Sequence, residues 1–344
     1  MRSLSKIQLA AASLANSDVS TIVEALKDKV LGDSKQEVTN AKLLLRELVR
    51  HGKFLSFFLS MKSHNPSFLT AMLSTSPSQI NFLSEHDVPK ICQDLTEIMT
   101  DKLASIAPKA VVNLSVNKDK HVRSALANKM TGNMAEIVPE AVIKLSKDED
   151  PYVRRDLVTA LRKGMSQVGT EVLQNFAKDT FYEVRMGIAK SITDEIAERM
   201  PHIVLDLSSD KHPRVRQFLA EVITSDIARA VPGAVRNLSK DDKPEVRGAL
   251  VMRLTGEIGT QMPDVILTLS NDGDLNVRVR LARAMTNEIA QSVPEAVQNL
   301  VQSNECYTIL LERSQEEGKD GMLYKLTKQR HETVAGFVRM LFPN

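Results

Sequence analysis

The feature that most constrains this chain is a sequence period of 31 residues. Val-Arg pairs recur at this interval and begin at Val122, Val153, Val184, Val215, Val246 and Val277. A proline column keeps the same interval, with Thr170 in its one missing place: Pro108, Pro139, Pro201, Pro232, Pro263 and Pro294. A Leu or Phe stands six positions after each member of that column. Self-similarity at roughly 20 to 50 residues is the signature of a repeat architecture, so we expect an array rather than one globular core.

Each repeat is predicted to be a pair of helices joined by a polar turn. In residues 201–231, Pro201 suits a first helical position, where no backbone hydrogen bond is lost. The apolar stripe of this helix is Ile203, Val204 and Leu207. After a turn, one second helix is expected to carry Val215, Leu219, Ala220, Ile223 and Ile227. Such a unit cannot bury its apolar faces alone, so the repeats must stack on one another.

Length and composition agree with an elongated array. The chain has 344 residues, and single cores stop growing at roughly 250–300. Trp is absent and aromatic residues make up 4%, so the core must consist of small aliphatic side chains. A net charge of +2 gives no strong field for nucleic acid or an anionic membrane. No apolar run is long enough to span a membrane, and two distant cysteines, Cys92 and Cys306, indicate a reducing compartment such as the cytoplasm.

The pattern Leu-Ser-x-Asp-x4-Val-Arg-x2-Leu-Ala, at residues 207–220, resembles the short HEAT-like repeat of phycobilisome-lyase-type proteins and many bacterial solenoids. The resemblance covers about residues 77–303. It implies an all-α, right-handed solenoid of about seven HEAT-like or armadillo-type repeats, the first one degenerate. It also implies a structural ladder between successive repeats, made by Arg123, Arg154, Arg185, Arg216, Arg247 and Arg278 with Asp148, Asp179, Asp210, Asp241 and Asp272. Ile91-Cys92 departs from the pattern at the N-terminal end, and a phosphate-binding stripe is the alternative for the arginines.

The candidate binding surface lies on the helices that begin at the proline column, which by the same resemblance line the concave face. Two adjacent positions on these helices vary between repeats, as a tailored surface would: Asn113, Ile143, Lys144, Gln174, Asn175, Leu205, Asp206, Arg236, Asn237, Leu267, Thr268, Gln298 and Asn299. Asn recurs there in every second repeat and is expected to bind an extended peptide backbone, as in armadillo arrays. Solvated polar surface is the alternative for these asparagines.

One repeat is irregular between its helices. Arg162-Lys163-Gly164 replaces the usual Thr-x-Glu, and Gly169-Thr170 replaces the usual residue before proline and the proline itself. Two glycines so close together predict a bend in the array and a flexible segment.

The ends of the chain do not follow the period. Residues 1–75 and 304–344 are predicted to be helical caps around a repeat array at 76–303. In the first cap we expect helices at 19–31, 38–48 and 54–61, with a phenylalanine cluster that is either core or a ligand pocket. The first 17 residues are either an ordinary helix or a targeting segment. In the second cap we expect helices at 305–314 and 321–341, the latter basic and amphipathic, which either caps the array or binds membranes or partners.

No sequence motif indicates catalysis. The seven histidines have no zinc-site spacing, and no phosphate-binding loop, nucleophile elbow or dinucleotide fingerprint occurs. We therefore expect a non-catalytic scaffold without cofactor or metal that binds a protein or peptide. The alternatives are a HEAT-like nucleic-acid binder and an enzyme accessory resembling bilin lyases. The lack of Trp and the scarcity of aromatic residues count against a HEAT-like DNA glycosylase.

Overall fold

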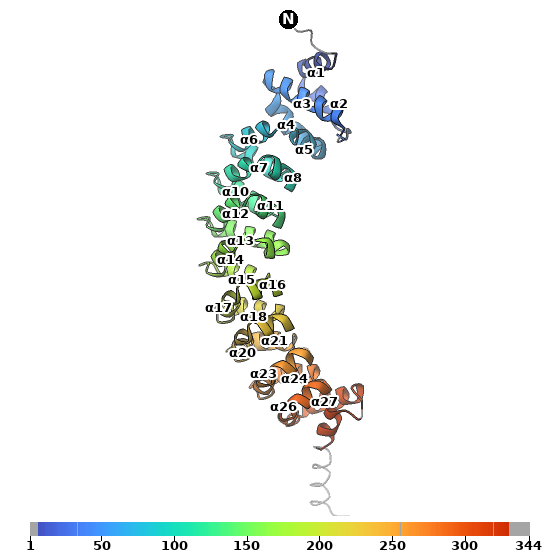
Figure 1. The fold of residues 1–344 in the computed structure, drawn as a ribbon, viewed down its shortest axis with the longest axis vertical. Helices are drawn as coiled ribbons and strands as arrows, with labels where there is room; N and C mark the ends of the chain where they lie inside the picture. The colour runs from blue at the N-terminus through green and yellow to red at the C-terminus, as the bar shows by residue number, and fades with distance from the viewer. Residues whose placement is uncertain (1–5, 33, 255, 319, 330–344) are drawn as a thin grey trace, which may run out of the picture. The chain divides into compact units, whose positions relative to one another are not determined.

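A computed structural model gives the fold of residues 6–32, 34–254, 256–318 and 320–329, with side chains from residue 10 onward. Among these residues the regular secondary structure is helical, and no strand occurs. The chain divides into two compact units, residues 1–175 and 176–344. Within each unit, short helices stack one after another in chain order (Figure 1).

Every repeat contains three helices in a fixed order. The V-R helix contains the Val-Arg pair, or Ile91-Cys92 in its first copy: α7 (Pro89–Glu97), α10 (Lys120–Lys129), α13 (Pro151–Ala160), α15 (Tyr182–Ala189), α18 (Pro213–Val222), α21 (Pro244–Val251) and α24 (Leu275–Ala284). The Thr helix follows, mostly with threonine before its first residue: α8 (Asp101–Ile106), α11 (Gly132–Ile137), η1 (Leu161–Gln167), α16 (Asp194–Arg199), α19 (Ser225–Ala230), α22 (Gly256–Gln261) and α25 (Asn287–Ser292). The Pro helix begins at the proline column: α6 (Pro77–Ser84), α9 (Pro108–Ser115), α12 (Pro139–Ser146), α14 (Thr170–Ala177), α17 (Pro201–Ser208), α20 (Pro232–Ser239), α23 (Pro263–Ser270) and α26 (Pro294–Leu300).

Each class of helix stacks on its own class in the next repeat. In the second unit the V-R helix α18 contacts α15 and α21, and the Thr helix α19 contacts α16 and α22. The Pro helix α20 contacts α17 and α23, and these three lie along one edge of the unit (Figure 1). The first unit repeats the scheme with α7, α10 and α13. The predicted all-α solenoid is therefore confirmed within each unit.

The expectation of two helices per repeat was wrong, because the long second helix breaks into two. In the repeat at 201–231 the break falls at Ile223, whose ψ of 127° is not helical. Thr224 then caps α19 by accepting a hydrogen bond from the amide of Ile227 (3.1 Å). At the end of α19, Pro232 disfavours helical backbone at Val231, and it starts α20. The proline column thus ends one helix and begins another.

The core runs between the three classes of helix and is aliphatic. One column of the V-R helices has no exposed surface in any repeat: Leu126, Leu157, Ile188, Leu219, Leu250 and Leu281. The break in the predicted second helix leaves its apolar spacing intact, since Ile223 and Ile227 are also fully buried. Apolar periodicity therefore located the core correctly and missed the turn inside it.

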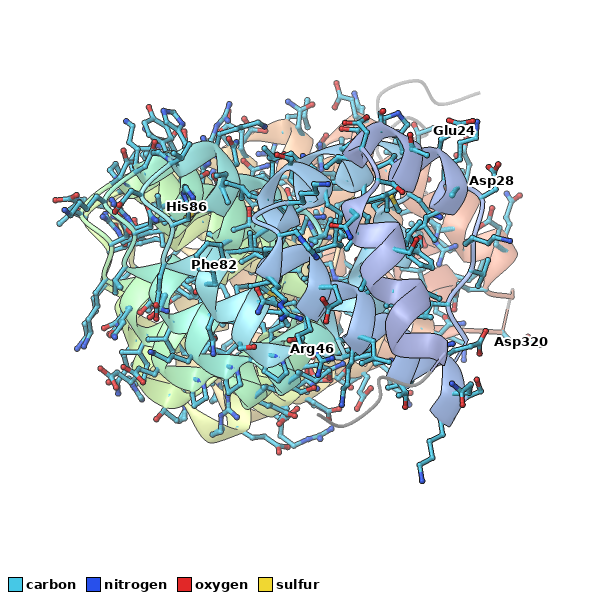
Figure 2. The ribbon with its side chains drawn as sticks, turned by 90° about the horizontal axis from the view of Figure 1, so that it is seen from above. Glu24, Asp28, Arg46, Phe82, His86 and Asp320 are labelled. Carbon is cyan, nitrogen blue, oxygen red and sulfur yellow. The ribbon has the colours of Figure 1, made fainter. Side chains whose placement is uncertain are left out.

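Five helices precede the repeats: α1 (Lys6–Asn16), α2 (Val19–Leu26), α3 (Lys35–Arg50), α4 (Phe54–His64) and α5 (Pro66–Leu73). Most of the phenylalanine cluster is core, because Phe57 and Phe58 have no exposed surface and Phe54 and Phe68 are buried. Phe82 on α6 is half exposed, and its ring lies 6.2 Å from that of Phe54. The ring of His86 meets Phe82 edge-on at 5.9 Å (Figure 2).

After the repeats, α27 (Asn304–Glu316) covers the helix expected at 305–314. Residues 322–329 are also helical, and the rest of the helix predicted over 321–341 lies outside the described residues. Among the described residues, no helix combines the length and the apolar character needed to cross a bilayer. The boundaries of the two caps remain predictions.

The irregular repeat differs from the others in conformation and in packing, while the predicted bend remains a prediction. Its Thr helix is a 3-10 helix, η1, with non-helical backbone at Gly164. A Cβ atom at Gly164 would lie 2.6 Å from the Cα of Gly132 in the preceding repeat, closer than real Cβ contacts allow. Glycine is therefore required for close backbone approach between α11 and η1, and the predicted flexibility remains untested.

Candidate partner-binding surface

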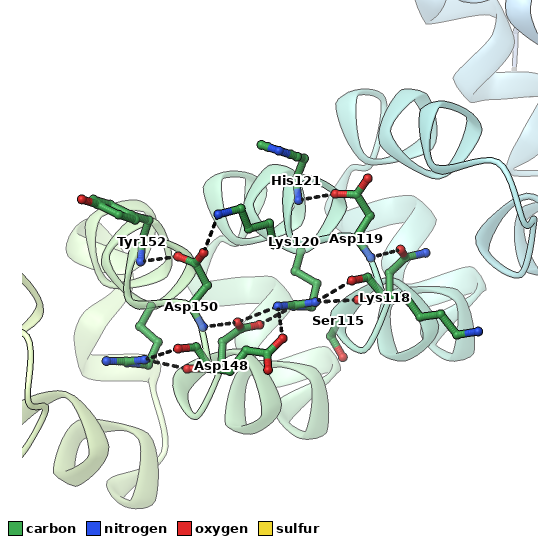
Figure 3. Close-up of polar contacts among 12 residues, drawn as sticks. Ser115, Lys118, Asp119, Lys120, His121, Asp148, Asp150 and Tyr152 are labelled. Carbon is green, nitrogen blue, oxygen red and sulfur yellow. Dashed lines mark hydrogen bonds and ion pairs between the residues drawn. The ribbon is translucent and has the colours of Figure 1, made fainter.

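Arginine and aspartate side chains link successive repeats within each unit. Arg123 on α10 donates to Asp148 of the next repeat from Nε (2.6 Å) and from Nη2 (3.0 Å). Figure 3 shows the polar contacts around Asp148 and the neighbouring turn residues Asp119 and Asp150. In the second unit the same fork joins three further pairs, with Nε–O distances of 2.5 to 2.6 Å: Arg185–Asp210, Arg216–Asp241 and Arg247–Asp272.

Each of these arginines also holds the turn of its own repeat. Nη1 of Arg216 donates to the carbonyl oxygen of Asp210 (2.7 Å), six residues earlier. The same bond is made by Arg123, Arg154, Arg185, Arg247 and Arg278. One guanidinium can therefore bind to two consecutive turns, because it has five N–H donors in a planar arrangement.

The aspartates close the turns that the arginines hold. The carboxylate of Asp241 accepts the amide of Lys243 (2.9 Å), two residues on, and thereby makes a local turn before α21. Asp148, Asp179, Asp210 and Asp272 make the same bond. Since Arg123 and Arg185 are buried, these guanidinium groups are used inside the array, which argues against the phosphate-binding alternative.

The ladder changes the titration of its members. The hydrogen bond to Asp241 is the main cause of the raised pKa of Arg216. Burial alone would raise the pKa of Asp210, but hydrogen bonds from Arg185 and the amide of His212 hold it below its ordinary value.

Cys92 stands where the first V-R helix would carry its arginine, and it keeps part of the arginine's role. Its thiol donates to the carbonyl oxygen of His86 (3.2 Å), which is again six residues earlier. Burial raises the pKa of this thiol, so it stays protonated as a donor. The departure at Ile91-Cys92 therefore preserves the contact within the repeat.

Comparison with known proteins finds likeness in structure alone. No protein-family model matches the sequence, and no curated protein matches it. A leucine-rich repeat variant with a novel repetitive structural motif has 19% identity and a TM-score of 0.46, covering 72% of this chain and 86% of that one. Importin beta has 12% identity and a TM-score of 0.46, covering 90% and 51%. Kap95p, from a complex with RanGDP, has 14% identity and a TM-score of 0.47, covering 97% and 54%. This chain thus spans about half the length of importin beta and of Kap95p.

These scores carry no argument about function, and the fold type rests on the chain's own geometry. Stacked helical repeats with a period of 31 residues, joined from turn to turn by Asp–Arg forks, decide it. The repeats form an α-helical solenoid within each unit.

The predicted surface residues of the repeats all lie on Pro helices, from α9 to α26. Those up to Asn175 belong to the first unit and the others to the second. Six are exposed: Gln174, Leu205, Asp206, Arg236, Asn237 and Gln298. Seven are half-buried: Asn113, Ile143, Lys144, Asn175, Leu267, Thr268 and Asn299. All of these positions therefore lie on the same class of helix, but they differ in how exposed they are to a partner.

The recurrent asparagines contact the preceding repeat. The side-chain amide of Asn175 donates to the hydroxyl of Ser146 (2.8 Å), and that of Asn299 donates to Ser270 (2.9 Å). Asn237 and Asn113 bond in the same way to Ser208 and Ser84. Asn113 and Asn237 use both amide hydrogens in this way, because they also donate to Glu85 and Ser209. For Asn175 and Asn299 the bond to serine occupies one of the two amide hydrogens, so a peptide could meet the second hydrogen or the side-chain oxygen.

The charged and apolar residues of the predicted surface differ in their contacts. Arg236 bridges to Asp264 of the next repeat (2.6 Å), and Lys144 pairs with Glu140 on its own helix (2.8 Å). Leu205 is 42% exposed, and its Cδ1 would lie 3.2 Å from a Cβ at Gly233 in the following repeat. Glycine at position 233 therefore lets α20 approach Leu205 closely.

Sequence reasoning missed the serine column that receives the asparagines. Ser146, Ser208 and Ser270 are buried at the end of their Pro helices, and each also donates to a carbonyl oxygen three residues earlier. The signal was present, because serine recurs at the same interval as the leucine before it. In the part of the chain that the structure describes, no group of three His, Cys, Asp or Glu side chains could hold a metal ion.

Proposed function

We propose that this protein is a non-catalytic scaffold that binds a protein or peptide partner on the outer faces of its Pro helices. The supporting observation is a contrast between the inside and the outside of each repeat. Inside, the Leu, Ser, Asp and Arg columns repeat nearly unchanged. Outside, the matching positions of α17, α20 and α23 carry Leu205-Asp206, Arg236-Asn237 and Leu267-Thr268. Repeats with the same interior residues and different exposed side chains suit recognition of a partner along the stack.

Site-specific crosslinking tests this proposal. A photoreactive amino acid replaces Leu205 on α17 in the full chain, which is then irradiated in lysate from its source cell. Since Leu205 is exposed on a Pro helix, we expect a discrete adduct with another polypeptide. Glu195 on the Thr helix α16 is also exposed and serves as the matched control site. Equal adducts at both sites, or an adduct removed by nuclease, would contradict a protein-binding face at the Pro helices.

The compartment is a further part of the proposal. We place the protein in the cytoplasm, because Cys92 and Cys306 are both free thiols and both buried. Mass determination of the protein isolated with its thiols blocked should find both unmodified by disulfide formation.

A further inference from the structure

Two hollows adjoin on the V-R helices of the second unit, away from the residues considered so far. The first has a volume of about 510 Å³ and lies across α18, α21 and α24, with Gly248 and Val279 in its wall. The second has a volume of about 420 Å³ and is lined by Met252 and Leu254. Arg280 and Arg283 of α24 line both hollows, so the two form one groove with a basic ridge.

The first hollow exists because of a small residue at one repeated position. Gly248 takes the place held by Ser124, Arg155, Met186, Gln217 and Val279 in the other V-R helices. A Cβ atom there would be in ordinary contact with the side chain of Arg280, at 3.5 Å from its Cδ. A larger side chain at 248 would therefore occupy the hollow and displace Arg280 without touching the core.

The two arginines have no acidic partner in the described part of the chain. Neither Arg280 nor Arg283 makes an ion pair or side-chain hydrogen bond there, and both are exposed. Two other exposed arginines of this unit are paired with acids, since Arg229 bridges to Glu257 (3.2 Å) and Arg236 to Asp264. The ridge thus offers two guanidinium groups whose donors are available to a ligand.

Apolar surface accompanies this charge. Met252 is 67% exposed beside Arg283, and its flexible thioether can adapt to different apolar side chains. The groove therefore combines two free cations with one adaptable apolar contact.

We propose that this groove binds an extended acidic peptide segment of a partner protein. Two carboxylates of the segment pair with Arg280 and Arg283, and an apolar side chain near them covers Met252. The occupant follows from charge complementarity, because Arg–carboxylate pairs can be bidentate and directional. The inference rests on the protein-binding function proposed above, but it uses a different set of helices.

Features of the rim favour a peptide over a nucleic acid. Glu245 and Asp274 line the first hollow, and they would repel an unbroken run of phosphates. No aromatic side chain lines either hollow, so bases would find no stacking platform there. A peptide can place its carboxylates at the arginines and neutral residues at the acidic rim.

Fluorescence anisotropy with a defined probe set tests the proposal. The probes are labelled twelve-residue peptides with glutamates at varied spacing around one leucine, matched peptides with lysine in place of glutamate, and a labelled oligothymidylate. With the full chain we expect saturable binding of at least one glutamate peptide, weakening with salt, and no binding of its lysine counterpart. Arg280→Glu with Arg283→Glu should weaken this binding by about tenfold or more.

Two further variants keep the test independent of folding. Gly248→Gln should weaken the peptide by filling the hollow while keeping the helical circular dichroism and melting midpoint of the parent. Arg229→Glu, on the Thr helix α19, changes the charge as much as either single reversal would and should leave the affinity unchanged. The proposal would be overturned if no glutamate peptide bound, or if the double charge-reversal variant bound the peptide as tightly as the parent. Tighter binding of the oligothymidylate than of any glutamate peptide would overturn it as well. None of these outcomes would alter crosslinking at Leu205, so the scaffold function is judged separately.

Discussion

At the scale of single residues, glycine decides how closely two repeats approach in the first unit. The Cα of Gly132 is the nearest backbone atom to a Cβ built at Gly164, at 2.6 Å. Gly164→Ala should therefore destabilise the protein by roughly 1–3 kcal/mol, the usual cost of overpacking. The free energy of unfolding from urea titration measures this.

The same loop supplies the control for that substitution. Gly169 is exposed, and a Cβ there would meet no atom within 4 Å. Gly169→Ala should be neutral or slightly stabilising, since it restricts the unfolded chain. An equal loss of stability in both variants would mean that the approach of α11 and η1 does not depend on glycine.

The ladder carboxylates predict how stability depends on pH. Because the pKa of Asp210 is lower in the folded protein, its contribution is present above the pKa of the unfolded chain, about 4. That contribution is lost as pH falls through the folded-state pKa. Asp210→Asn should thus be less stable than the parent at pH 7 and should lose less further stability between pH 5 and 2. Urea titrations at several pH values measure this, and parallel curves for the two proteins would contradict it.

At the scale of helices, threonine caps set where the Thr helices begin. The hydroxyl of Thr224 accepts the amide of Ile227 and also contacts Asp194 of the preceding repeat. Thr224→Ala should cost roughly 1 kcal/mol, with faster hydrogen exchange in the first turn of α19. Thr260→Ala on α22 is the control, because that hydroxyl is exposed and bonds only to a carbonyl of its own helix, that of Glu257. Equal effects of the two changes would show that the cap does not define α19.

Helix content could be predicted from the sequence, whereas the number of helices per repeat could not. Leu219, Ile223 and Ile227 follow helical spacing, so periodicity alone favours one continuous helix. The turn at Ile223 and Thr224 keeps all three buried and so leaves no trace in that pattern. A threonine that recurs directly before a small or acidic residue was the available signal, and its meaning depends on backbone geometry.

At the scale of the whole molecule, the sequence predicted the buried interior of the repeats better than the binding surface. Identical columns report a shared interior, because every repeat must satisfy the same neighbours. Exposed positions have no such constraint, and the asparagines showed the difficulty, since Asn175 and Asn237 bond to serines of the preceding repeat. The groove at Arg280 could not be predicted at all, because it depends on an absent side chain at Gly248 in a neighbouring helix.

One arginine joins two consecutive repeats, and this link is the central feature of the fold. A double-mutant cycle on Arg216 and Asp241 tests it, since these residues lie in consecutive repeats and their side chains bond at 2.5 and 2.8 Å. Arg216→Ala alone should cost roughly 3–5 kcal/mol by leaving Asp241 buried without its partner. The two substitutions together should cost less than their sum, with a coupling of roughly 0.5–3 kcal/mol, whereas a control cycle of Arg216 with Asp272 should be additive. Additive costs for Arg216 and Asp241 in urea unfolding would contradict the ladder as the link between repeats.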